Sequence, residues 1–83
     1  MSGDNGEYIA VNFTLGTLNY PIPCKLNYTF SRVENEFYLN NPEYKKEKGK
    51  YYFIANGIKL ESNKALAEQG IKDRDNILIN EFL

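Results

Sequence analysis

The stretch FIANGIKLESNKALAEQGIKDRDNILI, residues 53–79, decides the fold of this chain. It begins inside a segment, YYFIANGIKL, that is rich in the aromatic and β-branched residues that strands favour. Asn56-Gly57 lies in the middle of that segment, and this pair suits the type I′ turn that joins two strands of a hairpin. We therefore expect a strand, a tight turn and a short second strand that runs through Leu60.

The end of the chain predicts one short helical turn and a last strand. Asn63 can cap a turn over Ala65 to Gln69, and Gly70 can close that turn from the left-handed region. The last strand is NILINEFL, residues 76–83, in which side chains alternate between two faces. One face carries Ile77 and Ile79, and the other carries Leu78, Asn80 and Phe82.

Two more strands are predicted before this stretch. Residues 8–15 alternate between apolar and polar side chains, which is the period of a half-buried strand. Residues 20–26, YPIPCKL, alternate in the same way. Proline cannot donate a hydrogen bond to a neighbouring strand, so Pro21 and Pro23 place this second strand at an edge of the sheet.

A helix of about ten residues is predicted between the two halves of the chain. Phe30, Val33 and Phe37 recur at helical spacing, and Thr29 can cap the first turn. Asn40-Asn41-Pro42 should end this helix, because a residue before proline is pushed out of helical space. YKKEKGK, residues 44–50, then predicts a charged loop, with a phosphate-binding patch as the alternative to a solvated loop.

The order of these elements predicts an α+β fold of the β-grasp type. In that fold one helix packs across a mixed sheet of four to five strands, with a short helical turn before the last strand. A chain of 83 residues is too short for two separate cores. We expect residues 1–7 to be a flexible N-terminal tail and residues 8–83 to be the domain.

The stretch 53–79 resembles ubiquitin from its third strand to its fifth, and the rest of the chain matches ubiquitin less closely. Six apolar residues fall in register with the core of that family without a gap: Phe53, Leu60, Leu66, Ile71, Ile77 and Ile79. The resemblance implies a ubiquitin-like domain of the ubiquitin superfamily. It also implies a sheet in which the third and fifth strands are neighbours.

Strand alternation then predicts an exposed apolar patch. If Phe53, Ile77 and Ile79 point inward, a set of neighbouring side chains points outward, with Leu15 or Leu18 at its rim. Such a patch on a small domain most often marks a protein contact. The predicted protein-binding residues are Tyr52, Ile54, Leu78, Asn80, Phe82 and Leu15.

The resemblance implies that this face, centred on Ile54, docks partner proteins. The expected partner is a ubiquitin receptor, a proteasome-type protein or another binder of ubiquitin-like domains. This face departs from that of ubiquitin at four residues. Leu78 stands where ubiquitin has a histidine, and Asn80 stands where it has an apolar residue. Tyr52 and Phe82 each stand where ubiquitin has an arginine. Receptors that are tuned to ubiquitin itself should therefore bind this face poorly.

Three functions are open from the sequence. The first is a noncatalytic interaction domain of the ubiquitin and proteasome pathway, or a module of a larger protein. The alternative is a modifier or sulfur carrier, whose chemistry needs a Gly-Gly end that is missing from this chain, since Leu83 falls short of that position. A module that binds small GTPases is the third, and it is disfavoured by Pro21 and Pro23 on the edge strand.

Composition argues against several other functions. Histidine is absent, which removes Ser-His and Cys-His catalysis, and we expect no catalytic, cofactor-binding or metal-binding residues. Ten basic residues against eleven acidic ones indicate no nucleic-acid or membrane partner. Cys24, the one cysteine, is expected to be buried and unreactive. We expect a monomer inside the cell, in the cytoplasm or the nucleus.

Overall fold

The structure, a computed structural model, describes residues 7–45 and 49–82, so the predicted tail falls almost entirely outside the described residues. One sheet contains β1 (Tyr8–Leu15), β2 (Leu18–Lys25), β3 (Tyr51–Ala55), β4 (Ile58–Lys59) and β5 (Asn76–Glu81). In the described residues three helical segments accompany it, namely α1 (Phe30–Asn40), α2 (Pro42–Lys45) and the 3-10 turn η2 (Ala67–Gln69).

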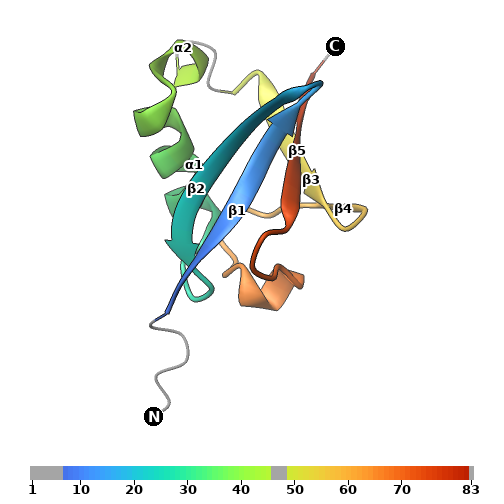
Figure 1. Cartoon of the computed structure of the whole chain (residues 1–83). Helices are drawn as coiled ribbons and strands as arrows, with labels where there is room; N and C mark the ends of the chain where they lie inside the picture. The colour runs from blue at the N-terminus through green and yellow to red at the C-terminus, as the bar shows by residue number, and fades with distance from the viewer. Residues whose placement is uncertain (1–6, 46–48, 83) are drawn as a thin grey trace.

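The strand order is β2-β1-β5-β3-β4, with β1 and β5 parallel and the other neighbours antiparallel. Helix α1 lies against one face of this mixed sheet (Figure 1). The arrangement confirms the predicted α+β architecture of the β-grasp. It also confirms that β2 is an edge strand and that β3 lies beside β5.

Phenylalanine rings fill the space between α1 and the sheet. Phe13 of β1 is fully buried, and its ring stacks on Phe37 of α1 with 4.5 Å between centroids and 13° between planes. Phe53 of β3 meets Phe13 edge-on at 5.7 Å, and Phe30 lies within 5.2 Å of Phe53. The core therefore joins both halves of the chain through ring contacts, which add to the free energy of burying their area.

The local signals for α1 and for the β3–β4 turn are confirmed. The Thr29 side chain accepts a hydrogen bond from the backbone N–H of Arg32 at 3.4 Å, as an N-cap does. Asn56 and Gly57 both have positive φ, 54° and 78°, which the type I′ turn requires and which few other residues tolerate. Gly70 closes η2 with φ 77°.

The prediction of a charged loop over residues 44–50 is partly wrong, because its first two residues, Tyr44 and Lys45, belong to α2. Pro42 opens this turn, a position where its missing N–H costs nothing. Tyr44 is buried, its hydroxyl lies 2.8 Å from that of Tyr20, and its ring packs on Phe37. Burial and the hydrogen bond to Tyr20 raise the pKa of Tyr44. Residues 46–48 lie outside the described residues, so the phosphate-binding alternative for this loop stays a prediction.

The predicted cap at Asn63 is also wrong, because the short helix begins only at Ala67. Backbone bonds to the segment before α1 hold the intervening residues: Leu66 donates to Tyr28 at 3.0 Å, and Lys64 accepts from Phe30 at 3.0 Å. Backbone held in this way cannot wind into a helix that starts next to Asn63. Glu68 instead accepts a hydrogen bond from the backbone N–H of Ala65.

The ring stack predicts a large effect at Phe13 and a small one at its neighbour. Replacing Phe13 by alanine should lower the free energy of unfolding by about 3–5 kcal/mol, since it leaves a cavity between α1 and the sheet. Thr14 points to the opposite face, and Thr14→Ala should cost less than about 1 kcal/mol. Urea unfolding followed by circular dichroism measures both, and equal losses would contradict this account of the core.

Candidate functional site

The candidate site is the sheet face that α1 leaves uncovered, which we call the outer face. On β3 and β5, directly opposite residues bring the predicted side chains together: Ile54 faces Leu78, and Tyr52 faces Asn80. Phe82 follows β5 on the same side. The structure thus gathers five of the six predicted binding residues, four on two neighbouring strands and Phe82 directly after β5.

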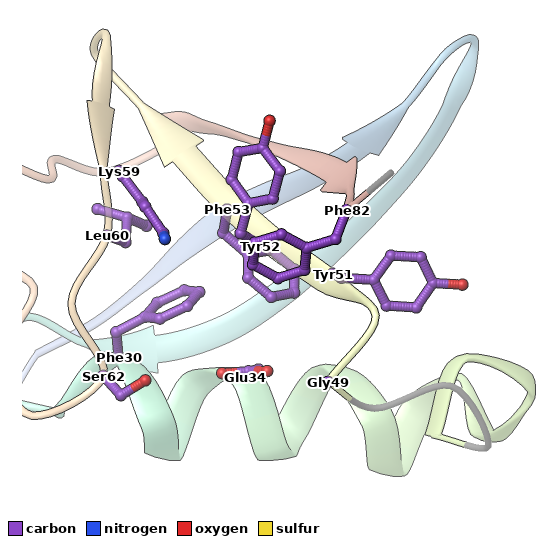
Figure 2. Close-up of a pocket in the computed structure, with 10 residues that line it drawn as sticks. All are labelled: Phe30, Glu34, Gly49, Tyr51, Tyr52, Phe53, Lys59, Leu60, Ser62 and Phe82. Atoms are coloured by element: carbon purple, nitrogen blue, oxygen red, sulfur yellow. The ribbon is translucent and has the colours of Figure 1, made fainter.

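An aromatic pair occupies one end of the outer face. The rings of Tyr52 and Phe82 lie 4.9 Å apart at 41°, and the Lys59 Nζ lies 5.5 Å from each ring centroid (Figure 2). Cations at this distance from a ring face are attracted to it. The rings hold the lysine against the patch, so the site joins apolar surface with one positive charge.

Lys59 was not among the predicted site residues. It lies directly opposite Ile54 in the β3–β4 hairpin, so it shares the face of that residue. The sequence contains the signal for this position, since a two-residue turn at Asn56-Gly57 fixes the pairing of the two strands. Counting outward from the turn pairs Ala55 with Ile58 and then Ile54 with Lys59.

The centre of the outer face is open to solvent. Leu78 is 49 % exposed and Phe82 is 51 % exposed, whereas Tyr52, Ile54 and Asn80 are half-buried. The Asn80 side chain donates a hydrogen bond to the backbone carbonyl of Leu78 at 3.3 Å. Its amide therefore lies along its own strand and leaves the neighbouring apolar side chains accessible.

The placement of Leu15 at the rim of this patch is wrong. Leu15 shares the parity of Phe13, and it packs against the buried core on the α1 side. Leu18, its partner across the hairpin, points to the same side and is 51 % exposed at the turn. The β1 residue that lies beside Leu78 on the outer face is Thr14.

A row of asparagines covers the other half of the outer face. The Asn12 amide group donates to the side-chain oxygens of Asn19, at 3.0 Å, and Asn76, at 3.2 Å. This row crosses β2, β1 and β5 and uses both amide hydrogens of Asn12 within the protein. The outer face is therefore divided into an amide half and an apolar, aromatic half.

A pocket of about 310 Å³ opens beside the aromatic pair, between β3, the segment after β4 and α1 (Figure 2). Its one carboxylate, Glu34, accepts a hydrogen bond from the hydroxyl of Tyr38 at 2.8 Å. Burial, and then this hydrogen bond, raise the pKa of Tyr38. The group that Glu34 meets is thus a phenol held in its neutral form.

Solved structures with this architecture identify the fold. The NMR structure of the ubiquitin-like domain of an Arabidopsis thaliana protein matches with a TM-score of 0.73, 18% identity and coverage of 90% of this chain and 78% of that one. The chain has the ubiquitin-like fold. A second NMR structure of the same Arabidopsis protein matches with a TM-score of 0.72 and 18% identity, over 92% of this chain and 88% of that one.

The chain is also similar in structure to part of ATBAG1, whose crystal structure is a complex with HSP70. The TM-score is 0.69 and the identity 16%, over 88% of this chain and 40% of the ATBAG1 chain. No protein-family model and no curated protein matches the sequence.

Within residues 7–45 and 49–82, no three His, Cys, Asp or Glu side chains gather as a metal site would need. No helix in the same residues is long and apolar enough to cross a membrane. Cys24 on β2 is fully buried, as predicted, and burial raises the pKa of its thiol to about 11, against a smaller lowering by the Val11 backbone.

Because Cys24 is buried, we expect its thiol to react slowly with alkylating reagents while the domain is folded. At pH 8 a pKa of about 11 leaves on the order of a hundredfold less thiolate than an ordinary cysteine has, so iodoacetamide should label Cys24 at least that much more slowly before unfolding in urea than after it. Mass spectrometry measures both rates, and equal rates would contradict the assignment.

The same shift has a consequence for stability. Because the folded pKa lies above the unfolded value of 9.0, the neutral thiol contributes fully below that pH, and its contribution is lost as the pH rises through about 11. The free energy of unfolding should therefore fall as the pH rises from 8 through about 11. The fall from the value at pH 8 should be smaller in Cys24→Ala than in the unmodified protein, because the variant has no thiol.

Proposed function

We propose that this domain binds another protein through the outer face centred on Ile54 and catalyses no reaction. The observation that carries the proposal is a half-exposed apolar patch, Leu78 and Phe82 above all, with a lysine held at its edge. Contiguous apolar surface on a small domain costs free energy in water, and covering it with a partner recovers that cost.

Such a contact would be small and reversible. Full burial of one large apolar side chain is worth roughly 1.5–3 kcal/mol. Leu78 and Phe82 are already half-buried, so a partner that covers them gains only part of this free energy from each residue. Strand backbones hold the patch, so little ordering is needed when a partner arrives. We expect micromolar affinity, which suits transient contacts.

The proposed partner is a ubiquitin receptor, a proteasome-type protein or another binder of ubiquitin-like domains. The shared fold supports this class, and ATBAG1 offers an example of a protein with a similar segment that was solved in a protein complex. The domain would work as a monomer in the cytoplasm or nucleus, in the ubiquitin and proteasome pathway or within a larger protein.

Leu78 and Leu39 form a matched pair for a test of this proposal. Both are exposed leucines, but Leu78 lies at the centre of the outer face and Leu39, 66 % exposed, lies on α1. Leu78→Ala should weaken binding at least tenfold, because a buried leucine contact is lost, whereas Leu39→Ala should leave binding unchanged.

The measurement is an NMR titration of the labelled domain with ubiquitin receptors and proteasomal subunits. Resonances of Tyr52, Ile54 and Leu78 should shift together and saturate. If none of them moves with any of these proteins, or if both leucine variants bind alike, the proposed surface is wrong. Unfolding curves of the two variants check that neither change acts through stability.

A further inference from the structure

A second pocket, of about 530 Å³, lies where β1 begins, β2 ends and the chain turns into α1. It shares no residue with the outer face. The residues that line it are Tyr8, Lys25, Asn27, Tyr28, Thr29 and Arg32. Two cations, two phenols, an amide and a hydroxyl thus converge on one opening, and none of these six residues is acidic.

Each cation of this pocket is held over a tyrosine ring. The Lys25 Nζ lies 4.7 Å from the ring centroid of Tyr8, its directly opposite residue in the β1–β2 hairpin. The Arg32 Cζ lies 3.8 Å from the ring centroid of Tyr28. These contacts restrict two long side chains that would otherwise be mobile, so the charges are positioned before any ligand arrives.

Neither cation forms an ion pair within the part of the chain that the structure describes. Its ion pairs join Lys50 with Glu81, Lys64 with Glu61, and Arg74 with Asp73, and none of them includes Lys25 or Arg32. The whole chain carries a formal charge of −1. Glu36 of α1 is near enough to act on the pocket, since after the hydrogen bond to Tyr8 it is among the smaller causes that raise the pKa of Tyr28. A local charge of +2 without an ion-pair partner still stands out against the charge of the whole chain.

Side chains, and not the start of α1, would have to hold an anion here. The first backbone N–H groups of α1 already have acceptors: Phe30 donates to Lys64, Ser31 to Ser62, and Arg32 and Val33 to Thr29. The donors that remain are the guanidinium, the ammonium, the Asn27 amide and one phenol, since a hydrogen bond with Tyr8 is the main cause that raises the pKa of Tyr28. This set favours a ligand with several acceptor oxygens and more than one negative charge.

We propose that this pocket binds a phosphate monoester. Such a group carries a charge of about −1.5 to −2 and three acceptor oxygens, which matches two cations and several neutral donors. The planar guanidinium of Arg32 can donate two parallel hydrogen bonds to phosphate oxygens. Tyr8, with 66 % of its surface exposed, supplies an apolar wall for the organic part of the ester. The proposal does not rest on the protein contact proposed for the outer face.

The test uses phenyl phosphate as the probe, in an NMR titration of the labelled domain at low salt. Amide resonances of Tyr8, Asn27, Tyr28 and Arg32 should shift and saturate. Inorganic phosphate should bind more weakly, because it lacks a group for the Tyr8 ring, and benzoate, with a single charge, should bind more weakly still. Inorganic phosphate binding as tightly as the ester would overturn the choice of a monoester.

Two double variants separate a built site from general surface charge. Lys25→Gln with Arg32→Gln should weaken phenyl phosphate at least tenfold. Lys72→Gln with Arg74→Gln removes the same charge from exposed residues outside the pocket and should leave the affinity within twofold. Equal losses in both double variants, or shifts that never saturate, would overturn the site. Amide spectra of the unbound variants show that each remains folded.

A third titration identifies the source of the phosphate. A short peptide with one phosphotyrosine should bind at least as tightly as phenyl phosphate if the ligand is a modified protein, since flanking residues can add contacts. Weaker binding of this peptide than of phenyl phosphate would assign the pocket to small phosphate esters. Failure of every ester to saturate the four reporter resonances overturns the proposal for both sources.

Discussion

The parallel pairing of β1 with β5 is the constraint on which the rest of this structure depends. Phe13 lies opposite Ile77, and backbone bonds from Asn12 to Asp75 at 2.9 Å and from Arg74 to Ala10 at 2.7 Å fix the start of the pair. Parallel strands need a long connection, and here α1 and the β3–β4 hairpin supply it. This one pairing joins an N-terminal hairpin to the C-terminal half, so that both halves bury their apolar faces against the same helix.

That register also determines what the outer face contains. Because side chains alternate, burying Ile77 and Ile79 against α1 forces Leu78 to the other side of the sheet. The apolar outer face is thus tied to the core, although its residues contribute little to the core itself. Nothing on the α1 side requires position 78 to be leucine, and a polar residue there would satisfy the same fold. The fold alone therefore does not account for the choice of leucine, and the contact proposed for the outer face would account for it.

Much of the fold could be predicted because its signals are local. The strand period, the Thr29 cap and the Asn56-Gly57 turn each act within a few residues, and the structure contains all three. The errors arose where distant residues decide. Tyr44 is buried against Tyr20, which lies 24 positions earlier in the sequence. The backbone after Asn63 is held by hydrogen bonds to a segment more than thirty residues away. Leu15 was misplaced for a different reason, since its own strand period already assigned it to the core face.

The residues of the outer face could be predicted from the alternation of side chains along β3 and β5, and Lys59 from the register of the β3–β4 turn. The pocket around Lys25 and Arg32 was not predicted: five of its six residues lie within residues 25–32, but Tyr8 joins them only through the β1–β2 register. The two surfaces also rest on different physics. Charge attraction at the pocket weakens as salt shortens the Debye length, from about 10 Å at 0.1 M to about 3 Å at 1 M, whereas apolar burial at the outer face does not. A partner held by both surfaces would therefore lose more affinity at the pocket than at the outer face in high salt, because Lys59 is the charge held against the apolar patch while the pocket carries two cations.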